Sequence, residues 1–192
     1  MEQIVVCTAI FGPIKDVLQQ PENQSSHVRF VAFVDDPSAG QLNGWLLRKA
    51  EFQSDDPRRR ARQHKILSHK IYPDADVVLW VDGCLTPIQD VQALADQFLA
   101  NHDLAVFEHT ERGCIYKELE ACIRLVKDIP DVMRRQVAWH RAEGYPYDNG
   151  LAETTALLRR HTKDICEFNE TWWREVERGS VRDQLSFEVM MG

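Results

Sequence analysis

The apolar run at residues 76–81 (DVVLWV) is the feature of this sequence that most restricts its fold. It stops at Asp82-Gly83, a common turn pair. A near-continuous apolar run of this length is typical of a strand covered on both faces, as in a parallel sheet. Further β-rich runs predict strands of the same sheet at residues 3–11, 28–34, 45–53 and 103–107. The run at 45–53 is the weakest of these four.

Helical stretches separate the predicted strands. Apolar residues within 89–101 recur at the spacing of one helix face: Val91, Leu94, Ala95, Phe98 and Leu99. Further helices are expected at residues 58–71, 115–128, 131–142 and 163–178, with a last short helix from Ser180. The alternation of strands and helices predicts an α/β fold, a three-layer α/β/α sandwich with a mostly parallel sheet. Residues 35–44 are the only linker-like stretch, so we expect residues 1–192 to form a single domain.

Composition excludes several classes of function. The chain has 30 acidic and 23 basic residues, a net charge of −7, which argues against a nucleic-acid binder that works by bulk charge.

No apolar run approaches the roughly 18 residues of a transmembrane segment, and the N-terminus resembles a core strand and not a signal peptide. The five cysteines are scattered without a CxxC pair, which disfavours both a disulfide framework and a structural zinc site. We therefore expect a cytoplasmic protein.

Several familiar catalytic motifs are missing from the sequence. The first strand is followed by no GxGxxG, which counts against a nicotinamide-dependent dehydrogenase, and there is no Walker loop. A GxSxG elbow is also absent, which argues against a serine hydrolase of the α/β type.

The carboxyl end of the strand at 76–81 is the first candidate site. Ligands of open α/β sheets bind outside the carboxyl ends of the strands, and Asp82 follows this strand directly. Thr8 to Gly12 and Asp35-Asp36 end two other strands. The alternative is that Asp82-Gly83 is only a strand-to-turn junction.

A basic stripe is expected on the helix at 58–71. Its members share one helix face: Arg58, Arg62, Lys65 and His69. Arginine gives bidentate contacts to phosphate and lysine a point charge, so the stripe could hold a diphosphate. The alternative is a solvated helix face, although four basic groups together are less usual in a chain of net charge −7.

Polar residues in the second half offer weaker candidates. His109 precedes Glu111 and Arg112, and as a base, a ligand or a hydrogen-bonded loop residue it fits the last role best. Asn149-Gly150 is typical of a tight turn. Glu153 opens a β-like run, where a buried carboxylate without a partner is costly.

The remaining candidates have strong structural alternatives. Ser180 and Asp183 match the spacing of a capping box, so Asp183 is expected near the start of a helix. Trp172-Trp173 are expected to pack the helix onto the sheet and not to stack on a sugar. The cysteines are expected in or near the core, and Cys84, beside the Asp82 turn, is the one candidate nucleophile among them.

Two sequence blocks carry a resemblance to a known family. One has the pattern K-x-x-x-H-x-x-x-P…W-x-D-G, formed by Lys65, His69, Pro73, Trp80, Asp82 and Gly83. The other is R-D-Q-L-S-F at residues 182–187. With the intervening segments they span nearly the whole chain. The chain resembles a family of glycosyltransferase-like domains, formerly a domain of unknown function, that includes bacterial glycosyltransferase-domain proteins and plant cell-wall-related proteins.

The resemblance implies a GT-A-like fold and transfer of a sugar from a nucleotide-sugar donor to a glycan or other hydroxyl acceptor. It implies catalytic roles for Asp183 and Glu153. Donor contacts would come from Thr8, Ile10, Gly12, Asp35, Arg62, Lys65, His69, Asp82, Gly83, Arg182 and Gln184. Acceptor contacts would come from His109, Asn149 and Glu153.

The sequence departs from the GT-A pattern in two ways. The usual Asp-x-Asp metal motif is here Asp82-Gly83-Cys84, with one carboxylate, so a divalent cation (Mn²⁺ or Mg²⁺) at Asp82 would depend on donor phosphates and water. The basic helix face could replace that ion. The sequence also ends five residues after Phe187, which suggests that an oligomer could supply part of the site.

Three hypotheses follow from these observations. The first is a nucleotide-sugar-dependent glycosyltransferase. The second is a catalytically decayed module that binds nucleotide sugars without transfer, suggested by the single carboxylate. The third is an unrelated α/β hydrolase that uses Asp82 with Cys84 or His109.

Overall fold

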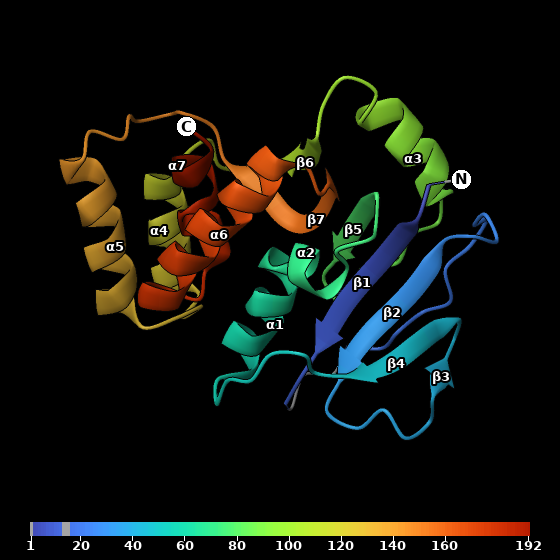
Figure 1. The fold of residues 1–192 in the computed structure, drawn as a ribbon. Coiled ribbons are helices and arrows are strands. Elements are labelled where there is room, and N and C mark those ends of the chain that lie inside the picture. Colours follow the sequence, from blue (N-terminus) through green and yellow to red (C-terminus); the bar gives the residue numbers. More distant parts are fainter. Residues whose placement is uncertain (1, 13–15) are drawn as a thin grey trace. The chain divides into compact units, whose positions relative to one another are not determined.

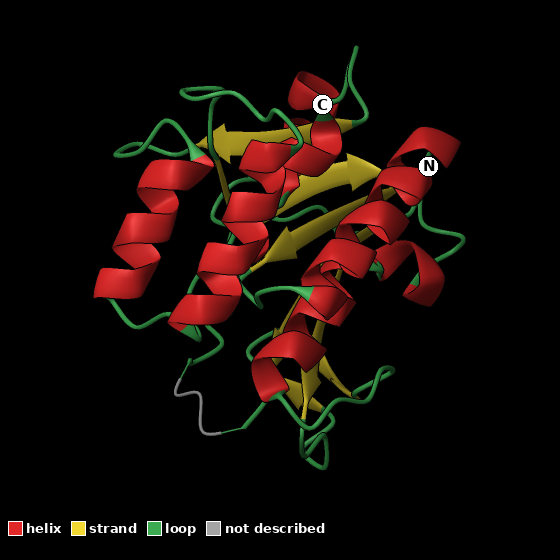
Figure 2. Cartoon of the chain, turned by 90° about the vertical axis from the view of Figure 1, so that its left-hand side faces the viewer, coloured by secondary structure: helices red, strands yellow, loops and turns green. Residues whose placement is uncertain are grey.

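A computed structural model describes residues 2–12 and 16–192 of the chain. The chain divides into two compact units, which we call unit 1 (Met1–Ala105 with Thr155–Cys166) and unit 2 (Val106–Thr154 with Glu167–Gly192). The strands, labelled in Figure 1, are β1 (Ile4–Ile10), β2 (Arg29–Val34), β3 (Gln41–Leu42), β4 (Trp45–Lys49), β5 (Val77–Val81), β6 (Leu104–Glu108) and β7 (Ala152–Arg160). The helices, red in Figure 2, are α1 (Pro57–Ile66), α2 (Ser68–Ile71), α3 (Val91–Phe98), α4 (Ile115–Arg124), α5 (Pro130–Ala142), α6 (Lys163–Arg178), the 3₁₀ turn η1 (Asp183–Leu185) and α7 (Phe187–Met191).

The strands form one mixed sheet. Its seven strands lie in the order β3-β4-β2-β1-β5-β7-β6. Strand β1 pairs in parallel with β2 on one side and with β5 on the other, and β2 pairs in parallel with β4 (Figure 1). Antiparallel pairing joins β3 to β4 and β7 to β5. The predicted α/β fold with a mostly parallel sheet is confirmed.

The central strands of unit 1 are apolar because both of their faces are covered. Every residue of β5 is buried, as are the first six residues of β1. Their side chains join a core cluster that includes Ile4, Val6, Trp45, Val77, Leu79 and Val91. Since β1, β2 and β5 are parallel, their carboxyl ends lie at the same edge of the sheet. The turns after these strands therefore come together within unit 1.

Helix α1 begins at a well-formed cap. The side chain of Asp56 accepts a hydrogen bond from the Arg58 N–H, 2.9 Å away, and Pro57 is the first helical residue. The sequence predicts one helix over 58–71, but α1 ends at Ile66, because the ψ of 30° at the next residue, Leu67, leaves the helical range, and the short α2 follows. The basic residues on these two helices therefore do not form one continuous stripe.

Unit 2 has a core of its own. The cluster contains Cys114, Ile115, Tyr116, Cys122, Met133, Val137, Leu151 and Leu185. Helices α4 and α5 are separate, as the proline at 130 predicts, and α6 covers the expected residues. Trp172 is fully buried and packs against Phe168 and Phe187, with ring centroids 5.7 and 5.0 Å away. Trp172 therefore serves packing, as expected, but its ring partners lie on α6 itself and on α7, whereas the sequence predicts packing onto the sheet.

Other local predictions were wrong. Strand β3 lies in the stretch expected to be a linker, and it exists because Leu42 pairs with Trp45 of β4. Asp183 opens the short η1 turn, as expected of a residue near a helix start, but the Ser180 hydroxyl accepts the Arg182 N–H at 3.0 Å and donates to Asp128 at 2.6 Å, so it forms no capping box with Asp183. Four cysteines are buried or half-buried, but Cys84 is exposed.

Candidate active site

Asp82 is the centre of a cluster of charged and polar side chains in unit 1. The Trp80 indole N–H donates to Oδ1 of Asp82 at 2.8 Å. Nη1 of Arg62 lies 3.8 Å and Nζ of Lys65 3.9 Å from the same oxygen. The Asp82 backbone N–H donates to the Thr155 carbonyl at 2.8 Å, which fixes the end of β5. The carboxylate is thus held by the fold and faced by two cations.

Helix α1 supplies both cations, three residues apart and therefore on one face. The Lys65 side chain is 1% exposed, whereas Arg62 and Asp82 are 18% and 22% exposed. A lysine this buried is stable only beside an opposite charge or other polar partners. The cluster therefore keeps a cation below the surface, where its field is screened less by water.

The carbonyl end of α1 is held by Arg159 of β7. The Arg159 guanidinium donates to the Lys65 carbonyl and to the Ser68 hydroxyl, the latter at 2.9 Å. Arg159 is fully buried, and burial lowers its pKa to about 10. Since it bonds the backbone of Lys65 itself, Arg159 fixes the residue that carries the buried ammonium group. Arg159 is not among the candidate residues of the sequence, although a basic residue in an otherwise apolar strand is a signal that could have pointed to it.

The loop after β1 is tied to the end of β2. Asp35 accepts the Gly12 N–H at 2.7 Å and an N–H of Arg60 at 2.8 Å. Gly12 has a φ of +70°, and a Cβ there would lie 3.1 Å from the ring of Pro57. The Arg60 guanidinium also lies 4.2 Å from the centre of the Phe11 ring. Asp35 therefore holds Gly12 and Arg60 in place, a role that strand-end position alone did not reveal.

The other candidates of unit 1 fall into different surroundings. Thr8 is fully buried, and its Oγ1 has no hydrogen-bond partner among residues 2–12 and 16–192. Gly83 packs close to Ile10, since a Cβ at Gly83 would lie 2.9 Å from the Ile10 side chain. His69 faces the ring of His161, 6.0 Å away, and Arg58 pairs with Asp56 at 3.8 Å. The structure brings Arg62 and Lys65 to Asp82, and gives Arg58 and His69 other neighbours.

A second cluster lies in unit 2, around His109 and Glu153. Nε2 of His109 is 3.6 Å from the Glu153 carboxylate and 2.7 Å from the Arg112 guanidinium. Its Nδ1 accepts the N–H groups of Glu111 and Arg112 at 3.1 and 3.2 Å. The side chain of His109 is 6% exposed and that of Glu153 34%. The histidine is thus a hydrogen-bonded loop residue, as its chemistry predicts, and it stands beside a carboxylate that solvent reaches.

A buried carboxylate supports this cluster. Glu118 is 2% exposed and accepts from Nε of Arg112 at 2.6 Å and from the Cys122 thiol at 3.0 Å, with Arg182 3.4 Å away. Burial acts to raise the pKa of Glu118, but these hydrogen bonds and the two guanidinium charges outweigh it, so the pKa lies below its ordinary value. Glu118 was not a candidate in the sequence, where a glutamate in a helix is typical of a solvated face.

The residues around η1 are fixed by hydrogen bonds within unit 2. Asp183 is 1% exposed, accepts from the Thr154 hydroxyl at 3.0 Å, and receives the Trp172 indole N–H on its carbonyl at 3.2 Å. Arg182 donates to Gln184 at 2.7 Å, and Gln184 donates to the Ala152 carbonyl at 3.1 Å. The bonds of Asp183 to Thr154 and of Gln184 to Ala152 hold the start of β7, and Glu153 lies between these two strand residues.

Asn149 lies apart from these networks. Its side chain is exposed and donates to the hydroxyl of Tyr145 at 3.2 Å.

The donor set around Asp82 does not suit a resident divalent cation. Mn²⁺ and Mg²⁺ prefer several oxygen ligands, whereas one oxygen of Asp82 already accepts the indole N–H and faces two cations. Over residues 2–12 and 16–192, no three His, Cys, Asp or Glu side chains cluster as a metal site would require.

None of the helices in the described ranges has the length and apolar character needed to cross a membrane.

The fold is shared with a known glycosyltransferase. The crystal structure of mouse xyloside xylosyltransferase 1 in its apo form matches with a TM-score of 0.54 and 10% sequence identity, over 99% of this chain and 81% of that one. The GT-A-like fold prediction is therefore confirmed.

Two curated proteins of Arabidopsis thaliana are similar in sequence. One, named "Probable hexosyltransferase MUCI70", is 28% identical over 214 residues, which cover 97% of this chain and 37% of that protein. The other, named "Alkaline ceramidase TOD1", is 25% identical over 225 residues, which cover 96% of this chain and 47% of that protein. The chain thus spans less than half of each of these relatives. The family described as "TOD1/MUCI70, glycosyltransferase-like domain" matches residues 1–192, and the chain belongs to it.

Proposed function

We propose that this chain is a glycosyltransferase domain that transfers a sugar from a nucleotide-sugar donor to a hydroxyl group of a glycan acceptor. The observation that carries the proposal is the Asp82 cluster, where two cations of α1 face a carboxylate at the carboxyl end of β5. Open α/β sheets bind ligands at this edge. A departing nucleoside diphosphate gains negative charge, which positioned cations stabilise. The family and the relative named a hexosyltransferase support this reading.

In this proposal Arg62 and Lys65 hold the donor diphosphate. Both lie 3.8–3.9 Å from Asp82, beyond the usual hydrogen-bond length of about 3 Å, so neither contact with the carboxylate is at hydrogen-bonding distance. Arginine offers a fork for two phosphate oxygens, and the buried lysine adds a point charge. Asp82, kept in place by Trp80, sets the spacing of the two cations. Because the residues do not suit a metal, no step in this mechanism uses one.

The nucleoside is proposed to contact the loop after β1, with Gly12 and Asp35. Their mutual hydrogen bond at 2.7 Å holds Gly12 against the end of β2. Asp35 is half-exposed, so one face of the carboxylate remains open to a ligand. Substitution of Asp35 would then weaken donor binding through the loop as well as through lost contact.

Glu153 is proposed to be the base for the acceptor hydroxyl. Its carboxylate reaches solvent and stands beside His109, whereas Asp183 is almost fully buried. In glycosyl transfer the acceptor oxygen bonds to the anomeric carbon, its proton passes to a carboxylate base, and the bond to the diphosphate breaks with its electron pair. Asp183 is proposed as a positioning residue, because it bonds Thr154, the neighbour of Glu153.

Donor binding provides the first test. Thermal unfolding is measured with UDP-, GDP- and dTDP-linked sugars, each with and without Mn²⁺. A donor at 100 times its Kd adds about 2.7 kcal/mol to the free energy of unfolding, which raises the melting temperature. Lys65→Met and Arg62→Gln are expected to remove this shift. Arg58→Gln is the matched control, because Arg58 lies on the same helix but pairs with Asp56. If no donor shifts the wild-type protein, the proposal fails.

Turnover separates a transferase from a decayed binding module. With a bound donor, release of the nucleoside diphosphate in the presence of glycan acceptors is expected, and Glu153→Gln should abolish it while keeping the donor-induced thermal shift. Thr154→Val should lower turnover less than Glu153→Gln does. Donor binding without any release of nucleoside diphosphate would instead favour the decayed module.

One comparison favours a second candidate function. The relative named an alkaline ceramidase covers 96% of this chain, so a hydrolase is the alternative. Within unit 1, the exposed thiol of Cys84 follows Asp82 closely in sequence and is the nucleophile such an enzyme could use. Hydrolysis of a ceramide substrate that Cys84→Ala abolishes, with no thermal shift by any nucleotide sugar, would establish this alternative over the transferase.

A further inference from the structure

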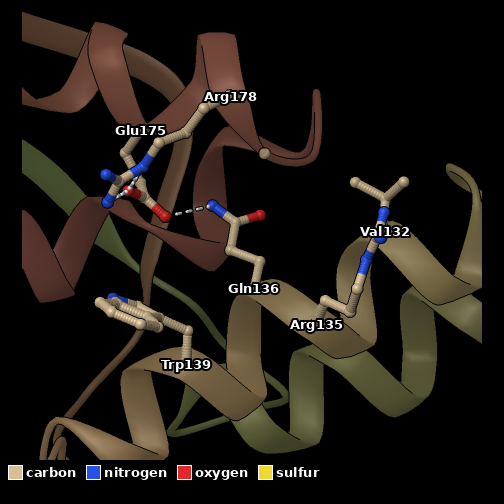
Figure 3. Close-up of a pocket in the computed structure, with 7 residues that line it drawn as sticks. Val132, Arg135, Gln136, Trp139, Glu175 and Arg178 are labelled. Atoms are coloured by element: carbon tan, nitrogen blue, oxygen red, sulfur yellow. Dashed lines mark hydrogen bonds and ion pairs between the residues drawn. The ribbon is translucent and has the colours of Figure 1, made fainter.

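A hollow of about 440 Å³ lies on the surface of unit 2. It lies between α5 and the last turns of α6, and it is lined by Val132, Arg135, Gln136, Trp139, Glu175 and Arg178. Figure 3 shows Gln136 pointing from α5 toward Glu175, with Arg135 and Trp139 on either side of it. None of these residues belongs to the clusters around Asp82 or Glu153.

The polar side chains on the floor of the hollow are hydrogen-bonded to groups of the protein. Oε1 of Gln136 accepts the Ser180 N–H at 2.9 Å, and its Nε2 donates to Glu175 at 3.0 Å. The other oxygen of Glu175 accepts from Nε of Arg178 at 2.7 Å (Figure 3). Gln136 and Glu175 are 6% and 3% exposed. A ligand would therefore be held by the walls of the hollow and not by its floor.

One wall is an exposed indole. Trp139 is 57% exposed, while the other four tryptophans of the chain are all buried at 7% or less. Leaving so large an apolar ring in water is unfavourable, and a ligand in the hollow that Trp139 lines would cover part of it. The flat face of an indole, with its polar N–H at one edge, packs well on the C–H face of a sugar ring.

The walls also carry positive charge. Arg135 is exposed and precedes Trp139 by four residues, so the guanidinium and the indole share one face of α5. The Arg178 side chain is 67% exposed. The lining contains two guanidinium groups and one carboxylate, a local excess of positive charge on a chain whose net charge is −7. A guanidinium pairs with a carboxylate in a bidentate geometry that neutral sugars cannot use.

We propose that this hollow binds an acidic saccharide, with one sugar ring stacked on Trp139 and its carboxylate paired with Arg135. The indole of Trp139 would bind the sugar ring, and the guanidinium of Arg135 would favour a sugar that carries a carboxylate. The proposal does not depend on glycosyl transfer, because the hollow contains no residue of the proposed catalytic machinery.

The exposed indole is also the reporter for the test. Acrylamide quenches the fluorescence of exposed tryptophan, so in this protein it reports on Trp139. The full chain is titrated with a β-1,4-linked mannuronate hexasaccharide and with β-1,4-mannohexaose, which differ in the carboxylate at C6. Protection of Trp139 by the mannuronate alone is the expected result. Equal protection by mannohexaose, or by a polyglutamate of matched charge, overturns the proposal, as does protection by neither saccharide.

Two variants and one control sharpen the test. Arg135→Gln is expected to weaken mannuronate binding about tenfold, the effect of one lost charge-assisted contact. Trp139→Ala should abolish binding in calorimetry, where no indole is needed as reporter. Arg134→Gln, on the same helix and paired with Asp131 at 3.0 Å, should leave the affinity unchanged. Equal loss in Arg134→Gln and Arg135→Gln would show unspecific charge attraction and would refute the assigned site.

Discussion

The indole N–H of Trp80 donates a 2.8 Å hydrogen bond to the carboxylate of Asp82, two residues further along the chain. Successive side chains of a strand alternate between its faces, so residues two apart point to the same side. The bond therefore continues the geometry of β5 beyond the last strand residue. It holds the carboxylate of a turn residue as firmly as a side chain of the sheet.

Trp80→Phe is predicted to lower both stability and donor affinity. The change removes the hydrogen bond to Asp82 and leaves a small cavity, a loss of about 1–3 kcal/mol in the free energy of unfolding. Trp45→Phe is the matched control, because Trp45 is equally buried and its indole donates to the Gln19 carbonyl at 2.9 Å. Urea denaturation and UDP-sugar titration should show similar destabilisation in both variants and weaker binding only in Trp80→Phe. Equal affinities would contradict a positioning role for Trp80.

His64 is predicted to make the protein sensitive to mild acid. Burial lowers the pKa of this histidine from its ordinary 6.5 to about 4. Its neutral ring donates from Nδ1 to the Arg60 carbonyl at 2.8 Å and accepts the Glu51 N–H on Nε2 at 2.9 Å. Above pH 6.5 neither folded nor unfolded chain binds the proton; between pH 6.5 and 4 only the unfolded chain does. The free energy of unfolding should fall over this window by up to about 3 kcal/mol from this group.

Urea midpoints measured from pH 7.5 to 4 check the acid sensitivity. His161, whose pKa burial also lowers to about 4, adds to the same slope. His64→Gln should reduce the slope between pH 6.5 and 4, and the same change at the exposed His102 should not. A slope that persists in full in His64→Gln would rule out this histidine as its source.

Glu118→Gln is predicted to be strongly destabilising. The carboxylate is 2% exposed and compensates the guanidinium groups of Arg112 and Arg182. Its neutralisation leaves two partly buried cations with reduced compensation, a loss of about 3–5 kcal/mol by the usual cost of breaking a buried pair. Glu120→Gln, at an exposed position of the same helix, should change the free energy of unfolding little. Equal urea midpoints for the two variants would mean that the network contributes nothing to stability.

Gly12→Ala is predicted to destabilise more than Gly40→Ala. Both glycines have a φ near +70°, which costs an L-residue about 1 kcal/mol. At Gly12 the new Cβ would also lie 3.1 Å from Pro57, whereas at Gly40 nothing lies within 4 Å. The difference between the two variants in urea denaturation measures the contact of the β1 loop with the start of α1. Gly12→Ala should lose more free energy of unfolding than Gly40→Ala does. A larger loss in Gly40→Ala would contradict a close contact between Gly12 and Pro57.

Much of the fold could be predicted from local pattern. The strand before Asp82 and helix α6 lie at the expected residues because the first is a near-continuous apolar run and the second is strongly amphipathic. Strand β3 was missed because two residues carry no periodicity and owe their conformation to pairing with β4. The predicted break between α4 and α5 is confirmed, because the effect of a proline at 130 depends on its own ring geometry and not on distant contacts.

The candidate site was less predictable because its contacts join distant residues. Arg62 and Lys65 reach Asp82, but Arg58 and His69, on the same expected stripe, find Asp56 and His161. Helical spacing predicts which residues share one face of a helix. It does not predict which residues from other parts of the chain will contact that face. The Ser180 hydroxyl likewise has a partner that helical spacing could not predict, since it donates to Asp128, 52 residues away in sequence, while it accepts the Arg182 N–H.

The convergence of three groups on Oδ1 of Asp82 has a consequence for sequence divergence. Trp80, Arg62 and Lys65 all lie against this one oxygen, so replacing one of them changes how much the other two contribute to stability and binding. Substitutions among groups that share a partner are non-additive, which makes these positions epistatic. A lineage that exchanges Asp82 for another residue must therefore also change the helix opposite it, and the four residues are expected to be inherited as a set.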